Sequence, residues 1–123
     1  MMNSDAKARS WLEFLAGEPC VPFGPTLQAH FNAGRITRLC GCGCNSFDLE
    51  ISQGVTLEPI VAPGRSGKCF EAVYESSTGA EVACLVFVDT RGYLSGLDVT
   101  CGDGNHGPLP DDVQLARLLH AGP

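Results

Sequence analysis

Two strand-like segments, residues 68–75 and 81–89, are joined by a turn that contains Ser76-Ser77-Thr78-Gly79. A short turn with a glycine for a left-handed backbone position predicts a β-hairpin, and therefore an antiparallel pair. Residues 82–88 are apolar on both faces, which favours a strand in the middle of a sheet or one covered by helices. The short turns leave no room for βαβ crossovers, so the sheet is expected to be mainly antiparallel.

One further strand is expected before this hairpin in the sequence, and one after it. Residues 46–52 alternate, which places Phe47, Leu49 and Ile51 on the buried face and carboxylates on the other face. Residues 93–101 follow a turn at residues 89–92 and form the next strand. The segment 54–67 contains two prolines and three glycines, so it is expected to be an irregular connection.

Helices are expected at both ends of the chain. Ser4 or Asp5 can cap a first helix whose apolar residues recur at helical spacing up to Leu15. A second helix is expected to start near Pro25, which suits the first helical position, and to stop at Gly34. A C-terminal helix is expected over about residues 111–120, because Val113, Leu115, Ala116, Leu118 and Leu119 have helical spacing after a possible aspartate cap.

These elements predict one α+β domain over residues 1–123, with helices in 5–33, strands in 35–101 and the C-terminal helix. The mainly antiparallel sheet is expected to have 4–5 strands. A chain of 123 residues with 44% hydrophobic content is long enough for one core and too short for two.

The net charge of -6 argues against nucleic acid as a partner, since no basic cluster offsets the repulsion of phosphates. No apolar run approaches the roughly 18 residues of a membrane-spanning helix, and the N-terminus lacks the features of a signal peptide. The chain is therefore expected to be cytoplasmic, with no membrane partner. Seven cysteines, an odd number, fit a reducing compartment better than a disulfide scaffold.

Cys40, Cys42 and Cys44 alternate with glycine, and this is the most unusual stretch of the chain. Thiolates are good zinc ligands, so a metal site is one hypothesis. Side chains two residues apart on a flat strand lie about 7 Å apart, too far for one ion unless the glycines bend the backbone. Cys101 and His106 are the favoured residues to complete such a site, ahead of the more distant cysteines.

Two other interpretations of these cysteines stay open. Free cysteine is one of the most frequently buried residues, so close packing around a bent backbone is favoured over metal binding. Thiol redox chemistry is less favoured, because it needs a nearby cation or a helix N-terminus, and only Arg38 is close in sequence.

A catalytic site is not expected, which favours a non-enzymatic protein, although the sequence leaves enzymatic activity uncertain. The sequence contains no nucleophile-elbow pattern, and the loop 63–68 departs from a phosphate-binding loop in its glycine spacing and in the strand that follows it.

The stretch Cys40-Gly41-Cys42-Gly43-Cys44-Asn45-Ser46-Phe47-Asp48-Leu49-Glu50, together with Gly92-Tyr93-Leu94-Ser95-Gly96-Leu97, resembles a pattern in small bacterial α+β proteins of uncharacterised function. The resemblance spans about residues 35–113. It implies a bacterial cytosolic α+β domain and brings no activity, cofactor or site residue with it.

The sequence therefore favours a small non-enzymatic module that binds another protein or assembles with itself, through a sheet edge. It is expected to need no cofactor. The alternative is a zinc-binding protein that uses Cys40, Cys42, Cys44, Cys101 and His106, and a thiol redox protein is the third hypothesis.

Overall fold

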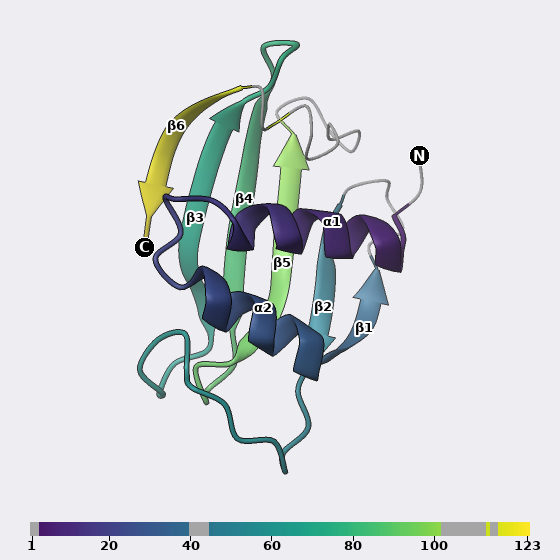
Figure 1. The fold of residues 1–123 in the computed structure, drawn as a ribbon, viewed down its shortest axis with the longest axis vertical. Coiled ribbons are helices and arrows are strands. Elements are labelled where there is room, and N and C mark those ends of the chain that lie inside the picture. The colour runs from purple at the N-terminus through teal and green to yellow at the C-terminus, as the bar shows by residue number, and fades with distance from the viewer. Residues whose placement is uncertain (1–2, 40–44, 102–112, 114–115) are drawn as a thin grey trace.

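The computed structural model describes residues 3–39, 45–101, 113 and 116–123. The elements in these ranges are α1 (Asp5–Ala16), α2 (Gly24–Ala33), β1 (Arg35–Leu39), β2 (Phe47–Glu50), β3 (Gly67–Glu75), β4 (Glu81–Val88), β5 (Leu94–Cys101) and β6 (Arg117–Gly122). The strands form one antiparallel sheet in the order β1-β2-β5-β4-β3-β6 (Figure 1). The expected α+β class with an antiparallel sheet is confirmed.

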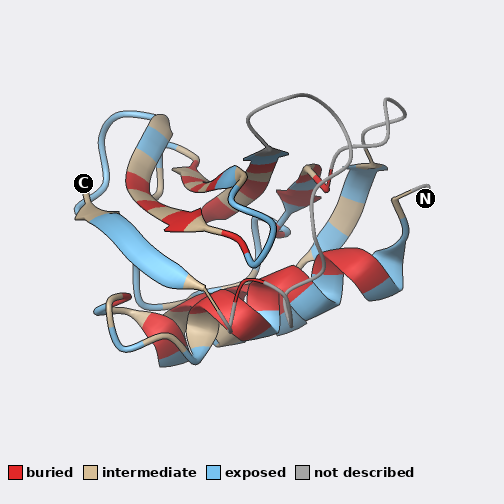
Figure 2. Ribbon diagram, turned by 90° about the horizontal axis from the view of Figure 1, so that it is seen from above, coloured by how far each residue is buried: buried red, intermediate tan, exposed pale blue. Residues whose placement is uncertain are grey.

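Both helices lie across the same face of the sheet and turn their buried residues toward it (Figure 2). Helix α1 begins as predicted, because the Ser4 Oγ accepts a hydrogen bond from the Lys7 N–H at 3.1 Å. Its buried stripe includes Trp11, Leu12 and Leu15, which are at most 1% exposed. In the described part of the chain, neither helix is long and apolar enough to cross a membrane.

The two predicted hairpins at the centre of the sheet are confirmed. Strands β3 and β4 pair from Glu75 and Glu81 outward, and the turn between them contains Gly79 at φ +85°. Strands β4 and β5 are joined by a turn with Gly92 at φ +78°. Positive φ values of this size favour glycine, so the glycines are needed where the chain reverses.

Strand β4 lies in the interior of the sheet, as its apolar sequence predicts. Its even-numbered residues 82–88 are buried under the helices. Ala83, Leu85 and Phe87 are half-buried on the opposite face, away from the helices. We call that opposite face the outer face. The outer face of β4 therefore carries three apolar side chains that the helices do not cover.

The predicted C-terminal helix is wrong for residues 117–120, and the sheet has six strands rather than 4–5. Residues Arg117–Gly122 pair with β3 as the edge strand β6. An isolated helix of about ten residues is marginal in water, whereas the free edge of β3 offers backbone hydrogen-bonding groups to any neighbouring extended segment. The helical spacing of Leu118 and Leu119 gave no indication of this edge strand. Both side chains are more than 40% exposed.

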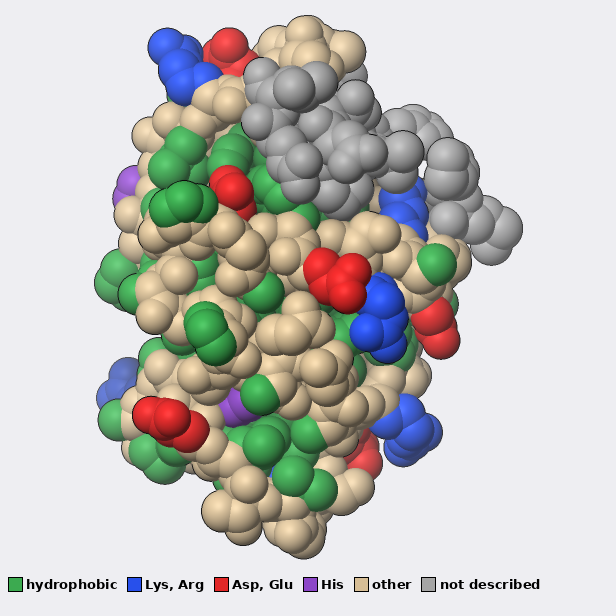
Figure 3. Space-filling view, viewed as in Figure 1, with side chains coloured by type: hydrophobic (Ala, Val, Ile, Leu, Met, Phe, Trp, Pro, Cys, Tyr) green, Lys and Arg blue, Asp and Glu red, His purple; other side chains and the backbone are tan. Residues whose placement is uncertain are grey.

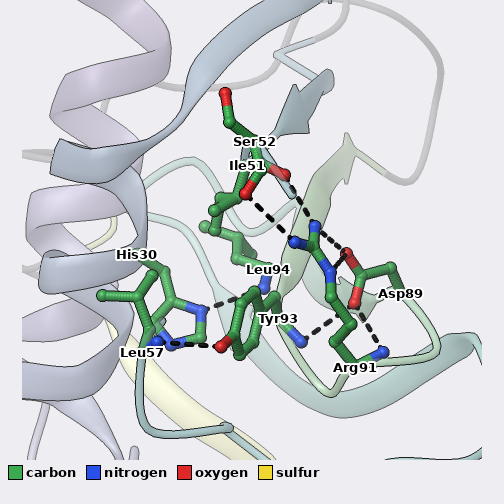
Figure 4. A network of polar contacts seen from close by, with 8 residues as sticks. All are labelled: His30, Ile51, Ser52, Leu57, Asp89, Arg91, Tyr93 and Leu94. Atoms are coloured by element: carbon green, nitrogen blue, oxygen red, sulfur yellow. Dashed lines mark hydrogen bonds and ion pairs between the residues drawn. The ribbon is translucent and has the colours of Figure 1, made fainter. Parts of the chain in front are cut away.

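The irregular connection 51–66 carries the chain from β2, past β5 and β4, to β3. A polar network holds it to the turn between β4 and β5 (Figure 4). The Arg91 guanidinium donates to the carbonyl oxygens of Ile51 at 2.7 Å and Ser52 at 3.3 Å. The Tyr93 hydroxyl accepts a hydrogen bond from the Leu57 N–H at 2.8 Å.

His30 extends this network into the core (Figure 4). Its Nδ1 accepts a hydrogen bond from the Leu94 N–H at 3.1 Å, so Nδ1 carries no proton. Its Nε2 lies 2.7 Å from the carbonyl oxygen of Glu58, to which it donates in the matching neutral tautomer. The side chain is fully buried, so His30 has a structural role here rather than an accessible one.

Candidate functional site

The predicted metal ligands lie mostly outside the described residues. This holds for Cys40, Cys42, Cys44 and His106. Cys101 ends β5, opposite Val82 of β4, and its side chain is not among those described. Among the described residues, no group of three or more His, Cys, Asp or Glu side chains could hold a metal ion.

The three cysteines whose surroundings are described are placed as packing residues. Cys84 is fully buried in β4, and burial raises the pKa of its thiol to about 12. Burial also raises the pKa of the half-buried Cys69. The Cys20 sulfur lies 3.6 Å from the Tyr74 hydroxyl. A raised pKa leaves a thiol protonated at neutral pH, which is unfavourable for metal binding and for redox chemistry.

The strand register brings together residues of the outer face that are far apart in the sequence. Asp48 of β2 lies opposite Gly96 of β5, and Gly96 lies opposite Phe87 of β4. Phe87 in turn lies opposite Lys68 of β3. Side chains at directly opposed positions point to the same face, so these four positions form one row across the sheet.

A second row lies beside the first. Asp98 of β5 lies opposite Leu85 of β4, and Leu85 lies opposite Glu71 of β3. A third row continues from Ala83 to Val73. Ala83, Leu85, Phe87 and Val73 therefore form a half-buried apolar centre with carboxylates on both sides of it. We call these four residues the apolar patch.

The carboxylates around the apolar patch have only weak cationic partners on the β2 side. The Arg38 Nη1 lies 4.0 Å from the Asp48 Oδ2, and the side chains of both residues are more than half exposed. Exposed ion pairs of this kind contribute at most about 1 kcal/mol. Asp98 and Glu81 have no ion-pair partner among the described residues.

On the β3 side the pairing is closer. The Lys68 Nζ donates a hydrogen bond to the Glu71 Oε1 at 2.8 Å. This hydrogen bond is the main cause that holds the pKa of Glu71 below its ordinary value, and the positive charge of Lys68 is the second cause. The Arg117 guanidinium lies 3.5 Å from Glu75. The β2–β5 side of the apolar patch, at Asp48 and Asp98, therefore carries less closely paired negative charge than the β3 side, and Glu81 adds an unpaired carboxylate at the start of β4 among the described residues.

A shallow depression of about 210 Å³ lies over this acidic side of the patch. It is lined by Asp48, Phe87, Ser95, Gly96 and Asp98. Gly96 has no side chain to fill the depression. A Cβ atom at this position would lie 3.0 Å from the Phe47 carbonyl oxygen and 3.3 Å from the Asp48 Oδ1. One oxygen of Asp48 therefore lies over Gly96, while the other faces Arg38.

Comparison of the chain with protein-family models, curated proteins and solved structures gives no match. The resemblance of the cysteine-rich stretch to small bacterial proteins therefore stays a prediction.

Two larger clefts are lined by described residues outside the apolar patch. A cleft of about 410 Å³ is lined by Asp89, Arg91 and the end of β2, but Arg91 and Asp89 are already bound to each other there. A cleft of about 360 Å³ lies between the helices and β1, near Asp5 and Arg9. On the side covered by the helices, charged side chains are scattered rather than gathered (Figure 3).

The sequence alone does not identify the residues that meet on the outer face. The alternation of residues 46–52 indicated that Asp48 points outward, and the two-sided apolar strand 82–88 indicated a covered or central position. The neighbours of these residues depend on the β2–β5 and β4–β5 registers, which no local pattern specifies. Only these registers place Asp48 and Phe87 on either side of Gly96.

Proposed function

We propose that this chain is a non-enzymatic module that binds another protein through the outer face of its sheet. The observation that carries the proposal is the apolar patch on the face of β4 that the helices do not cover. Apolar side chains at the centre of a face with charged residues around it are the usual anatomy of a protein–protein interface. The partner is expected to present basic side chains opposite Asp48 and Asp98.

The charge of this face also distinguishes a different protein from a second copy of the same chain. A symmetric dimer whose two-fold axis passes near Asp48 and Asp98 would bring these carboxylates of the two copies together. Like charges brought together in this way oppose association. Complementary charge in a different protein favours it, and the net charge of -6 adds long-range attraction to a basic partner.

Affinity capture with matched variants tests this proposal. Leu85→Arg places a positive charge in the apolar patch, and Glu13→Arg makes a similar change on the exposed side of α1. A partner captured by the wild type and then purified should bind the Glu13→Arg protein with unchanged affinity in calorimetry. It should lose most of its affinity for the Leu85→Arg protein.

Folding of both variants is checked by circular dichroism before binding is measured. Equal binding of the partner to wild type and to Leu85→Arg would contradict the proposal. So would a partner that loses affinity only with the Glu13→Arg change, because that result would place the interface on the helical side.

Zinc binding by the cysteine-rich stretch is the second candidate function. The residues that border the predicted ligand segments lie at one end of the sheet. Leu39 pairs with Phe47 there, and the Val99 N–H donates to the Ser46 Oγ at 3.1 Å, two residues before Cys101.

Asn45 supports the same candidate. Its side chain is fully buried at this end of the sheet, and neither polar atom of its amide has a hydrogen-bond partner among the described residues. A buried amide of this kind needs an explanation, for which a bound water or ion is one option. Elemental analysis of protein purified without a metal-affinity tag tests the site. About one zinc per chain is expected if it exists, and well under one contradicts it.

A further inference from the structure

We infer that the depression over Gly96 binds the guanidinium group of an arginine side chain that the protein partner presents. The inference rests on the proposed function, because it assigns the partner residue that the outer face recognises. It also makes a claim that can be tested without the partner, since the depression has its own shape and charge.

The shape of the depression suits a flat group on a long apolar stem. Gly96 supplies a floor of backbone between the side chains of Asp48 and Phe87, which lie opposite it on its two neighbouring strands. Asp98 lies two residues along β5 from Gly96 and completes the rim. A guanidinium group stacks on aromatic rings and binds carboxylates through its planar set of donors, whereas its methylene stem packs on apolar surface.

The charge of the depression supports the same ligand. The Asp48 Oδ1 lies 3.3 Å from the position that a Cβ of residue 96 would take, so this oxygen faces the depression. The Arg38 Nη1 lies 4.0 Å from the other oxygen, Oδ2. Asp98 has no ion-pair partner among the described residues. An incoming cation would therefore meet two carboxylates without displacing a strong existing contact.

The protein already contains an occupied arrangement of the same chemistry. The Arg91 guanidinium lies 4.6 Å from the centre of the Tyr93 ring and donates to the Asp89 carboxylate at 2.8 and 3.1 Å. Aromatic ring, carboxylate and guanidinium are combined there within one turn. The depression is lined by the same kinds of group, the side chain of Phe87 and the carboxylates of Asp48 and Asp98.

A titration of the complete chain with Nα-acetyl-L-arginine N-methylamide, followed by ¹H–¹⁵N NMR, tests the inference. Shift changes are expected to cluster at Asp48, Phe87, Gly96 and Asp98. The matched citrulline derivative has nearly the same shape without the charge, and it should cause no such changes at the same concentrations. A lysine derivative should bind more weakly, because an ammonium group lacks the planar donors.

Two variants locate the binding. Asp98→Asn removes one carboxylate charge with little change in shape, and it should weaken binding of the arginine derivative about three- to fivefold, as expected for a partly exposed ion pair. Gly96→Ala should reduce binding by filling the floor. Glu81→Gln is the control, since Glu81 is exposed on the same face at the far end of β4. It should leave binding unchanged.

The outcomes separate this inference from the proposed function. Shift changes that fall elsewhere, equal binding of the citrulline derivative, or full affinity in Asp98→Asn would overturn the arginine site. If Leu85→Arg still abolished binding of the protein partner, the proposed function would stand. A partner that ignores Leu85→Arg would contradict the proposed function, while specific arginine binding at Gly96 would still support a cation site.

Discussion

Arg91 is held from several sides in the turn between β4 and β5. Its guanidinium donates to Asp89 and to the carbonyl oxygens of Ile51 and Ser52, and it lies over the ring of Tyr93. Hydrogen bonds that involve a charged group contribute about 1.5–3 kcal/mol each when they are well ordered. This single side chain therefore fastens the connection after β2 to the central hairpin.

Gly92, the next residue, gives a direct test of how tightly the connection is held. A Cβ atom there would lie 2.2 Å from the Val61 carbonyl oxygen, and the φ of +78° is strained for any other residue. Gly92→Ala should lower the free energy of unfolding by more than about 2 kcal/mol in urea denaturation.

Gly79→Ala is the matched control for this prediction. Gly79 has a similar φ of +85°, but nothing lies within 4 Å of its added Cβ. The control should lose only the backbone strain, about 1 kcal/mol. Equal losses in the two variants would contradict a steric contribution from Val61.

Asp89 predicts a dependence of stability on pH. Burial by itself would raise its pKa, but hydrogen bonds from the Arg91 side chain and from the N–H groups of Arg91 and Tyr93 outweigh it and hold the pKa below the ordinary value. A carboxyl whose pKa is lowered by folding stabilises the native state above its unfolded pKa of about 3.9. This contribution is lost as the pH falls through the lower, folded pKa.

Comparison of the wild type with Asp89→Asn isolates this effect, because other carboxylates titrate in the same range. The wild type should be the more stable protein above about pH 4, and the difference in the free energy of unfolding should shrink below that pH. A difference that stays constant from pH 2 to pH 7, a range that brackets the unfolded pKa, would show that the charge of Asp89 contributes nothing.

At the scale of single elements, the first turn of α1 has a separable contribution. The Ser4 Oγ satisfies one of the backbone N–H groups that a helix leaves without partners at its start. Ser4→Ala should reduce the free energy of unfolding by about 1 kcal/mol, and Ser4→Asp should restore most of it. Thermal unfolding followed by circular dichroism measures both, and no loss in Ser4→Ala would contradict the capping role.

Strand β6 shows the opposite relation between an element and its sequence. Its pattern of leucines and alanine fits a helix, yet Tyr74 and Val73 of β3 pair with Leu118 and His120. A short segment with weak helical preference adopts the structure that its neighbours stabilise. The neighbour here is the free edge of β3.

At the scale of the whole molecule, the fold separates the core between sheet and helices from the outer face of the sheet. The helices cover one face of the sheet and bury the large apolar side chains, while the outer face keeps the apolar patch of β4 near the surface. The acidic net charge is expected to matter mainly for association.

Salt should therefore weaken binding of the proposed basic partner. Raising the salt concentration from about 0.05 M to about 0.5 M shortens the range of electrostatic attraction several-fold. The association rate in stopped-flow measurements should fall strongly, and the dissociation rate should change much less. An association rate that does not depend on salt would contradict the proposed role of Asp48 and Asp98.

The sequence by itself determined the helices at residues 5–33, the two central hairpins and the inward face of β2. These features depend on interactions between residues that are close in the chain: helical and alternating periodicity, a serine cap, and glycines at positive φ. The acidic character and the apolar nature of β4 were also visible, because they are properties of composition.

The tertiary structure decided which residues become neighbours. Pairing of β6 with β3, the rows that bring Asp48, Gly96 and Phe87 together, and the contact of Arg91 with Ile51 all join segments far apart in the chain. Strand register depends on the packing of whole elements and on the length of irregular connections, and these have no local signature in the sequence. The candidate binding site is built from such long-range neighbours, so it could be found only in the folded chain.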